Sequence, residues 1–207
     1  MSVSTFAQHD APSTWKRTKM RHIFSFRREV TTEELPLLGV NLSLGVMERY
    51  EGDGRPAASD DLSKYKLVEV GDIIMNALGK PHGSIGRSSV RGITSPAYWV
   101  LRANEKVAYS RYMHYVLRSS VAISEYQRRG KNLPPNQFDL PWDSFRDIEV
   151  PLPSLTQQLE IIKYLDREVD RVEAALERVK RLEQLVKGPL ATLAILGDID
   201  PRTNVRN

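Results

Sequence analysis

The sequence contains no cysteine among its 207 residues. This absence excludes disulfide bonds, thiolate metal ligands and a cysteine nucleophile. No run of about 18 apolar residues is present to span a membrane, and the N-terminus lacks the apolar segment of a secretory signal. The hydrophobic content of 41% is ordinary for a folded domain. We therefore expect a cytoplasmic protein that does not bind a membrane.

Familiar catalytic motifs are also missing. No Asp or Glu is followed two residues later by Lys, a spacing that is common in nuclease sites. The pair Gly79-Lys80 lacks the upstream glycine of a phosphate-binding loop. The four histidines are scattered, and no two of them have the spacing of metal ligands. We therefore predict no catalytic residue, no metal ion and no bound cofactor for this chain.

Positive charge is concentrated in one part of the chain. Residues 80–131 contain ten Lys or Arg against only two Glu, a net charge of +8, whereas the whole chain has +4. A basic stretch of this kind favours a polyanionic partner, most simply nucleic acid. A solvated basic face without a partner is the alternative reading of the same charges.

Residues 1–150 have the pattern of an irregular, strand-rich α+β domain. Short β-type runs such as residues 67–70, 73–75 and 97–101 alternate with turns rich in Gly, Asp, Pro and Ser. One helix is predicted at about 109–127, where apolar and aromatic residues recur on one face.

The pattern changes sharply at residue 150. Pro151 and Pro153 exclude a continuous helix there, because each proline lacks an amide donor and restricts the residue before it. Ser154 and Gln157 then have the spacing of a capping box, in which the hydroxyl accepts from an exposed amide and the Gln reaches back. The sequence therefore predicts that a long helix begins at this point.

The predicted helix runs to about Lys187 and has an apolar seam. The apolar residues follow one another at steps of three and four, a spacing near 3.5 that is typical of coiled coils. Mixed charges fill the other positions, and Gly188-Pro189 is expected to break or kink the helix. A helix folded back on its own domain is the alternative to pairing with another helix. The predicted interface residues are Leu159, Ile162, Leu165, Val169, Val172, Leu176, Val179, Leu182 and Val186.

Several segments together resemble the specificity subunit of type I DNA restriction–modification systems. The strongest is residues 148–158 (IEVPLPSLTQQ), followed by residues 161–166 (IIKYLD), which resembles the entrance to that family's conserved long helix. Residues 65–74 (YKLVEVGDII) and 95–98 (SPAY) resemble strands of its globular half, and residues 197–200 (GDID) resemble its tail. Gln157 replaces the family's usual Glu, and Gly188-Pro189 departs from an unbroken helix.

The resemblance implies a specific organisation. Residues 1–150 would be a target-recognition domain that binds double-stranded DNA, residues 151–200 the long helix for pairing and subunit docking, and residues 201–207 a tail. Family members carry two such domains and two helices, so this chain would be half of the usual unit. Its partners would be modification subunits, which bind S-adenosylmethionine and methylate adenine, and a restriction subunit; the specificity subunit itself is not catalytic.

Two loops of the basic stretch are the candidates for DNA contact. Arg and Lys contact guanine edges or phosphates, and Asn pairs with adenine, so these residue types near glycine-rich turns suit a DNA reader. For each of them a solvated surface position is the plain alternative. The candidates are Asn76, Lys80, His82, Ser84 and Arg87 in the first loop, and Arg128, Arg129, Lys131 and Asn132 in the second.

Three functional hypotheses remain open at this point. The favoured one is a half-length specificity subunit that forms a homodimer through its long helix and so binds two identical, inverted half-sites. The second is a truncated or inhibitory half-subunit that binds a modification subunit without specifying DNA. The third is the detached recognition part of a methyltransferase–nuclease.

Overall fold

The computed structural model describes residues 12–41, 45–50, 61–79, 84–133 and 137–195. The chain divides into two compact units, residues 1–160 and 161–207, and each is described by itself. Within the described residues the strands are β1 (Lys16–Lys19), β2 (Phe24–Phe26), β3 (Leu37–Asn41), β4 (Gly45–Glu48), β5 (Lys66–Val68), β6 (Ile73–Met75), β7 (Leu78–Gly79), β8 (Ile85–Arg87), β9 (Gly92–Thr94), β10 (Trp99–Ala103), β11 (Lys131–Leu133), β12 (Gln137–Asp139) and β13 (Glu149–Leu152).

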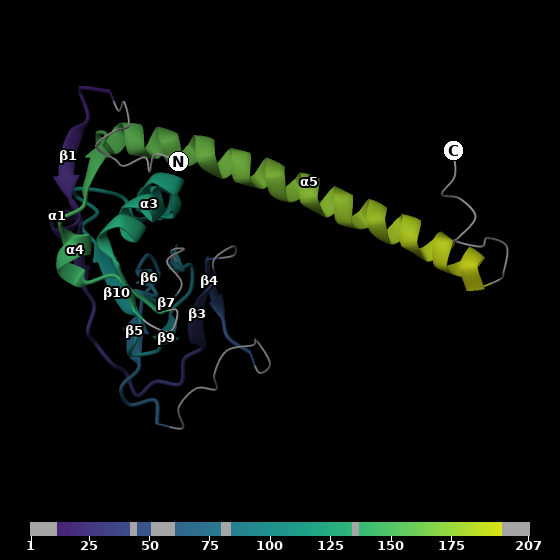
Figure 1. Ribbon diagram of the computed structural model, residues 1–207, viewed down its shortest axis with the longest axis horizontal. Coiled ribbons are helices and arrows are strands. Elements are labelled where there is room, and N and C mark those ends of the chain that lie inside the picture. Colours follow the sequence, from purple (N-terminus) through teal and green to yellow (C-terminus); the bar gives the residue numbers. More distant parts are fainter. Residues whose placement is uncertain (1–11, 42–44, 51–60, 80–83, 134–136, 196–207) are drawn as a thin grey trace. The chain divides into compact units, whose positions relative to one another are not determined.

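Short helices lie between these strands, and one long helix follows them (Figure 1). The predicted class, α+β with a strand-rich domain followed by a long helix, is confirmed. The helices within the described residues are α1 (Met20–Ile23), α2 (Ser110–Arg118), α3 (Ser120–Arg129), α4 (Trp142–Arg146) and α5 (Leu155–Ile195).

The strands of the first unit form small sheets rather than one large one. One four-stranded sheet has the order β2-β10-β6-β8, and a second has the order β4-β3-β9-β5. A three-stranded sheet, β11-β12-β7, and the pair β1-β13 complete the described sheets. Neighbouring strands are antiparallel except β3 and β9, which are parallel. In Figure 1 the labels β3, β5 and β9 mark the second four-stranded sheet.

Apolar side chains of both four-stranded sheets fill the core of the first unit. Leu38, Val68 and Val100 belong to one buried cluster, with exposures of 1%, 0% and 0%. The first unit also contains a group of packed aromatic rings, in which Trp99 lies edge-on to Trp142 at 5.5 Å between ring centroids. Burial of such large side chains contributes most of the free energy that holds a domain of this size together.

The Gly71-Asp72 pair forms the turn that precedes β6. Gly71 has a φ of 97°, a backbone conformation that side chains with a Cβ rarely adopt. The Asp72 carboxylate is 3% exposed, accepts the backbone amide of Glu69 and pairs with the guanidinium of Arg27. Because a buried carboxylate is costly without partners, these bonds fix the turn and the start of the strand.

The helix predicted at 109–127 is two helices, so the prediction of one continuous helix is wrong. Ser119 has a ψ of 152°, which is extended rather than helical. Its hydroxyl donates to the carbonyl of Val116 at the end of α2 and accepts the amide of Ala122 at the start of α3. One serine thus ends the first helix and caps the second.

The start of α5 has the predicted capping box. The amide of Gln157 donates to Ser154 Oγ at 3.3 Å, and the amide of Ser154 donates to Gln157 Oε1 at 3.1 Å. Gln158 is fully buried, where it accepts the amide of Tyr109 and donates to the carbonyls of Val107 and Pro153. These bonds hold the first turn of α5 within the first unit.

Gly188-Pro189 does not interrupt α5, which continues to Ile195, so the predicted break is wrong. A proline inside a helix removes one amide donor and crowds the preceding turn. Because helix formation is cooperative, a helix of 41 residues can absorb this local cost.

Candidate nucleic-acid interface

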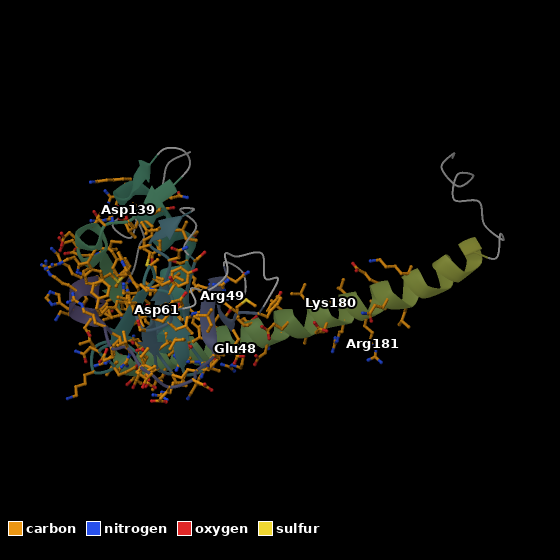
Figure 2. The ribbon with its side chains drawn as sticks, turned by 90° about the horizontal axis from the view of Figure 1, so that it is seen from below. Glu48, Arg49, Asp61, Asp139, Lys180 and Arg181 are labelled. Atoms are coloured by element: carbon orange, nitrogen blue, oxygen red, sulfur yellow. The ribbon has the colours of Figure 1, made fainter. Side chains whose placement is uncertain are left out.

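Strands next to the two segments predicted to contact DNA pair with a common strand in the β11-β12-β7 sheet. Strand β7 follows Asn76, and its Gly79 lies opposite Phe138 of β12. Strand β12 lies between β7 and β11, and Asn132 of β11 lies opposite the same Phe138 from the other side. The sheet therefore brings together two segments that are more than 50 residues apart in the sequence. Asp139 of this sheet is labelled in Figure 2.

A hairpin positions the first loop. The amide of Asn76 donates to the carbonyl of Ser84 at 2.9 Å, which closes the loop between β6 and β8. The side chain of Asn76 accepts the amide of Leu78 and so holds the start of β7. Lys80 and His82, which were predicted to contact DNA, lie outside the described residues.

Arg87, the last candidate of the first loop, is anchored inside the domain. Its Nε donates to the hydroxyl of Ser110 at 3.1 Å, and its backbone amide donates to His114 Nδ1 at 3.1 Å. Both partners belong to α2, so Arg87 ties the end of β8 to that helix. Its contact with DNA stays a prediction.

The predicted second loop is the end of α3 followed by β11: Arg128 and Arg129 lie in the helix, and Lys131 and Asn132 lie in the strand. Glu125 of α3 is 4% exposed and accepts Arg128 at 2.7 Å and Arg129 at 2.8 Å. Burial raises the pKa of Glu125, but the hydrogen bonds from the two guanidinium groups together lower it below its ordinary value. Both arginines are therefore held in place before any ligand binds.

Sequence reasoning missed Glu125, although its spacing gave a signal. Glu125 lies three and four residues before the two arginines, and residues at this spacing lie on one face of a helix. Read in this way, the basic run at residues 128–131 is partly an internal ion-pair network. Lys131, on β11, is exposed. The side chain of Asn132 lies outside what the structure describes, although its backbone belongs to β11.

Gly130 allows the close approach of the second loop to β12. A Cβ built on Gly130 would lie 2.0 Å from Cζ in the ring of Phe138. Phe138 is buried, with 6% of its surface exposed. No larger side chain fits between α3 and β11 unless this ring moves. The glycine thus links the end of the ion-paired helix to the sheet that carries both loops.

The predicted coiled-coil residues form a largely exposed apolar series on α5. Ile162 differs from the others, because it is 5% exposed, and Leu165 is half-buried. Charged side chains pair along the helix, as in Arg171–Glu168 at 2.6 Å and Lys180–Glu177 at 2.7 Å. Figure 2 labels Lys180 and Arg181, which project from the helix. The exposed predicted residues are Leu159 (42%), Val169 (42%), Val172 (58%), Leu176 (54%), Val179 (51%), Leu182 (60%) and Val186 (56%).

Two kinds of feature are absent from the described part of the chain. No helix there is long and apolar enough to cross a bilayer. No group of three or more His, Asp or Glu side chains there has the arrangement of a metal site.

Comparison with solved structures supplies the class of fold. The chain is similar to a structure of a type I restriction–modification system, with a TM-score of 0.64 and 17% identity over 96% of this chain and 53% of that chain. It is also similar to the HsdS subunit from Thermoanaerobacter tengcongensis, with a TM-score of 0.53 and 19% identity over 86% of this chain and 45% of that one. No protein-family model and no curated protein matches the sequence.

The fold is therefore that of a type I specificity subunit, as the sequence motifs predicted. Identities below 20% carry this conclusion for the fold alone. The chain spans about half the length of both solved structures that it matches.

Proposed function

We propose that this chain is a half-length specificity subunit of a type I restriction–modification system. Such a chain binds a DNA sequence and directs modification and restriction subunits to it. The observation that carries this proposal is the match of 96% of the chain to about half of one chain from such a system. One globular unit and one long helix are what half of a two-domain, two-helix subunit contains.

DNA binding is assigned to the first unit. The β11-β12-β7 sheet gathers loops from both ends of the most basic stretch of the sequence. Phosphate contacts position a protein on DNA and base contacts give specificity, and Lys, Arg and Asn supply both kinds of contact. We assign these roles to the loop residues named above, with Lys131 as a phosphate contact.

Homodimer formation is assigned to α5. Its seam residues from Val169 to Val186 are 42% to 60% exposed, and a second α5 with the same seam would cover them. A second copy would also supply a second globular unit and a second long helix, the set that a two-domain, two-helix subunit contains. A dimer with two-fold symmetry would bind two identical half-sites in inverted order.

Catalysis is assigned to the partners and not to this chain. We expect S-adenosylmethionine binding and adenine methylation on modification subunits, and DNA cleavage on a restriction subunit. The chain would bind no cofactor of its own.

Co-expression with a type I modification subunit tests this proposal. We expect the two proteins to copurify and to methylate adenines in one split, inverted-repeat sequence of plasmid DNA. The molecular mass of the purified chain in solution, without partners, should be that of a dimer. A complex that forms without methylating any defined sequence would contradict the proposal and support an inhibitory half-subunit.

A further inference from the structure

A second basic surface lies in the first unit, on elements that take no part in the β11-β12-β7 sheet. A groove of about 910 Å³ is formed by β1, α1, β13 and the residues around Ser154 at the start of α5. The turn that contains Lys106 contributes to it as well. None of the DNA-contact candidates predicted from the sequence lines this groove.

Cationic side chains dominate the lining. Glu149 is the acidic residue among the side chains that line the groove in the described part of the chain. Asp147, which is close by, pairs with Arg21 at 2.8 Å and with Lys19 at 3.7 Å, so two of the cations are partly neutralised. The basic side chains of the lining are Lys16, Arg17, Lys19, Arg21, His22 and Lys106.

Strand pairing fixes where the charges of β1 lie. Strand β1 pairs with β13 along its whole length, with Lys16 opposite Leu152 and Lys19 opposite Glu149. The chain turns from β1 directly into α1, so cations from a strand and a helix face the same hollow. Holding several cations together costs Coulomb energy, which an anion in the groove would recover.

The rest of the lining indicates which kind of anion fits. Protein–protein interfaces are enriched in aromatic residues and depleted in Lys. This groove has Lys16, Lys19 and Lys106, and no aromatic ring other than the imidazole of His22 among its described lining residues. Its neutral polar side chains are hydroxyls, which together with Lys and Arg are the groups that bind phosphate oxygens. They are Thr14, Thr18 and Ser154.

We propose that this groove binds the phosphodiester backbone of duplex DNA without regard to sequence, as a second contact separate from the reading loops. The choice of duplex DNA rests on the proposed function, whereas the choice of a phosphate ligand rests on the lining. Such a contact raises affinity for any duplex and depends strongly on salt, because each phosphate contact releases bound counterions.

Binding of a 30-base-pair duplex of unrelated sequence tests this inference. The probe contains no target site, so its binding reports phosphate contacts alone. In the full-length protein, Lys16→Gln, Arg17→Gln and Lys106→Gln are combined. We expect the affinity to fall at least about tenfold at 0.1 M salt, and the slope of log affinity against log salt to lose about 2.7.

A matched variant removes the same charge from α5. It combines Lys163→Gln, Arg178→Gln and Arg181→Gln, three exposed positions on α5 that do not line the groove. We expect its affinity and its salt slope to stay close to those of the unaltered protein. Equal losses in both variants would mean that net charge alone is responsible, and would overturn the inference.

A second variant changes the groove in the opposite direction. Glu149→Gln removes the carboxylate from the lining, so we expect tighter duplex binding and a steeper salt slope. The altered residue is exposed and lies on a strand end, so the fold should tolerate the change. Unchanged binding in both groove variants would overturn the inference.

The remaining outcomes separate the groove from the proposed function. If the unaltered protein binds no duplex, the groove inference fails. If it binds the unrelated duplex through the groove but methylation mapping finds no target, the groove inference stands and the proposed function fails. If the groove triple variant keeps duplex binding but no longer copurifies with a modification subunit, the groove is a protein-docking site and the inference is overturned.

Discussion

The two compact units treat their apolar side chains in opposite ways. In the first unit, Leu117 and Phe145 are fully buried, whereas on α5 Val172 and Leu182 are 58% and 60% exposed. The first unit thus removes its large apolar groups from water by itself. The helix does not, and a helix of this kind gains most of its stability from packing of its apolar face. The difference is that the first unit buries its large apolar side chains by itself, whereas α5 leaves an apolar series in contact with water. Under the proposed function, a second α5 would cover that series.

The largest expected effect comes from replacing one leucine by alanine in each unit and comparing the two losses of stability. Leu117→Ala leaves a cavity in the core and should lower the free energy of unfolding of the first unit by about 2–5 kcal/mol. Leu176→Ala, at a position that is 54% exposed, should change it by less than about 0.5 kcal/mol. Denaturant unfolding followed by tryptophan fluorescence measures both, because all three tryptophans lie in the first unit. Equal effects would contradict the contrast.

The next largest expected effect is a loss of dimer association when a charge is placed in the apolar seam of α5. Leu176→Asp places a carboxylate among apolar residues of the proposed dimer, which should weaken association at least about tenfold. Sedimentation at several concentrations measures the dissociation constant. Asp170→Asn, a change at an exposed position outside the seam, is the control and should leave association unchanged. A monomer in the unaltered protein at all concentrations would refute the dimer.

The third prediction concerns the pH dependence of the ion pairs that Glu125 makes in the first unit. The folded pKa of Glu125 lies below its ordinary value of 4.5, so the ionised form is favoured by folding. Its stabilising contribution is therefore complete well above pH 4.5, and it is lost as the pH falls through the lower, folded pKa. Glu125→Gln should unfold more easily than the unaltered protein at pH 7, and this difference should shrink toward pH 3. Urea unfolding over this range measures it, and a constant difference would disprove the assignment.

The smallest predicted effect concerns DNA. Lys131→Ala should weaken binding to every duplex to a similar extent and reduce the salt slope by about 0.9, the value for one phosphate contact. Lys163→Ala on α5 removes the same charge from the second unit and should have no such effect. An unchanged slope for Lys131→Ala would remove this lysine from the DNA interface.

Local chemistry made much of the fold predictable. The capping box of Ser154 and Gln157 depends on residues three positions apart, and the structure has it as predicted. Strand β6 coincides with the predicted run at residues 73–75. Ser119 misled the prediction, because the helical periodicity continues across it, and a serine that caps a helix resembles a serine within one.

The assembly of the candidate site was less predictable. The distribution of charge along the sequence indicated both segments. The sequence did not indicate that Gly79 of β7 and Asn132 of β11 lie opposite Phe138 of β12, one from each side. Strands of two or three residues are too short to show a periodicity, so such long-range pairing leaves no pattern in the sequence. The sequence did not predict the basic groove for a different reason. Its cations from Lys16 to Arg21 lie within residues 1–79, whose total charge is −1.

The pairing of β1 with β13 has a further consequence for how such a protein can change. Lys16 lies opposite Leu152, so the chain enters and leaves the globular unit through adjacent strands. Domains whose ends lie close together tolerate insertion and permutation, because the rest of the chain need not move to accommodate them. The segment between these two strands therefore begins and ends at neighbouring positions, so a change in its length need not alter where α5 begins.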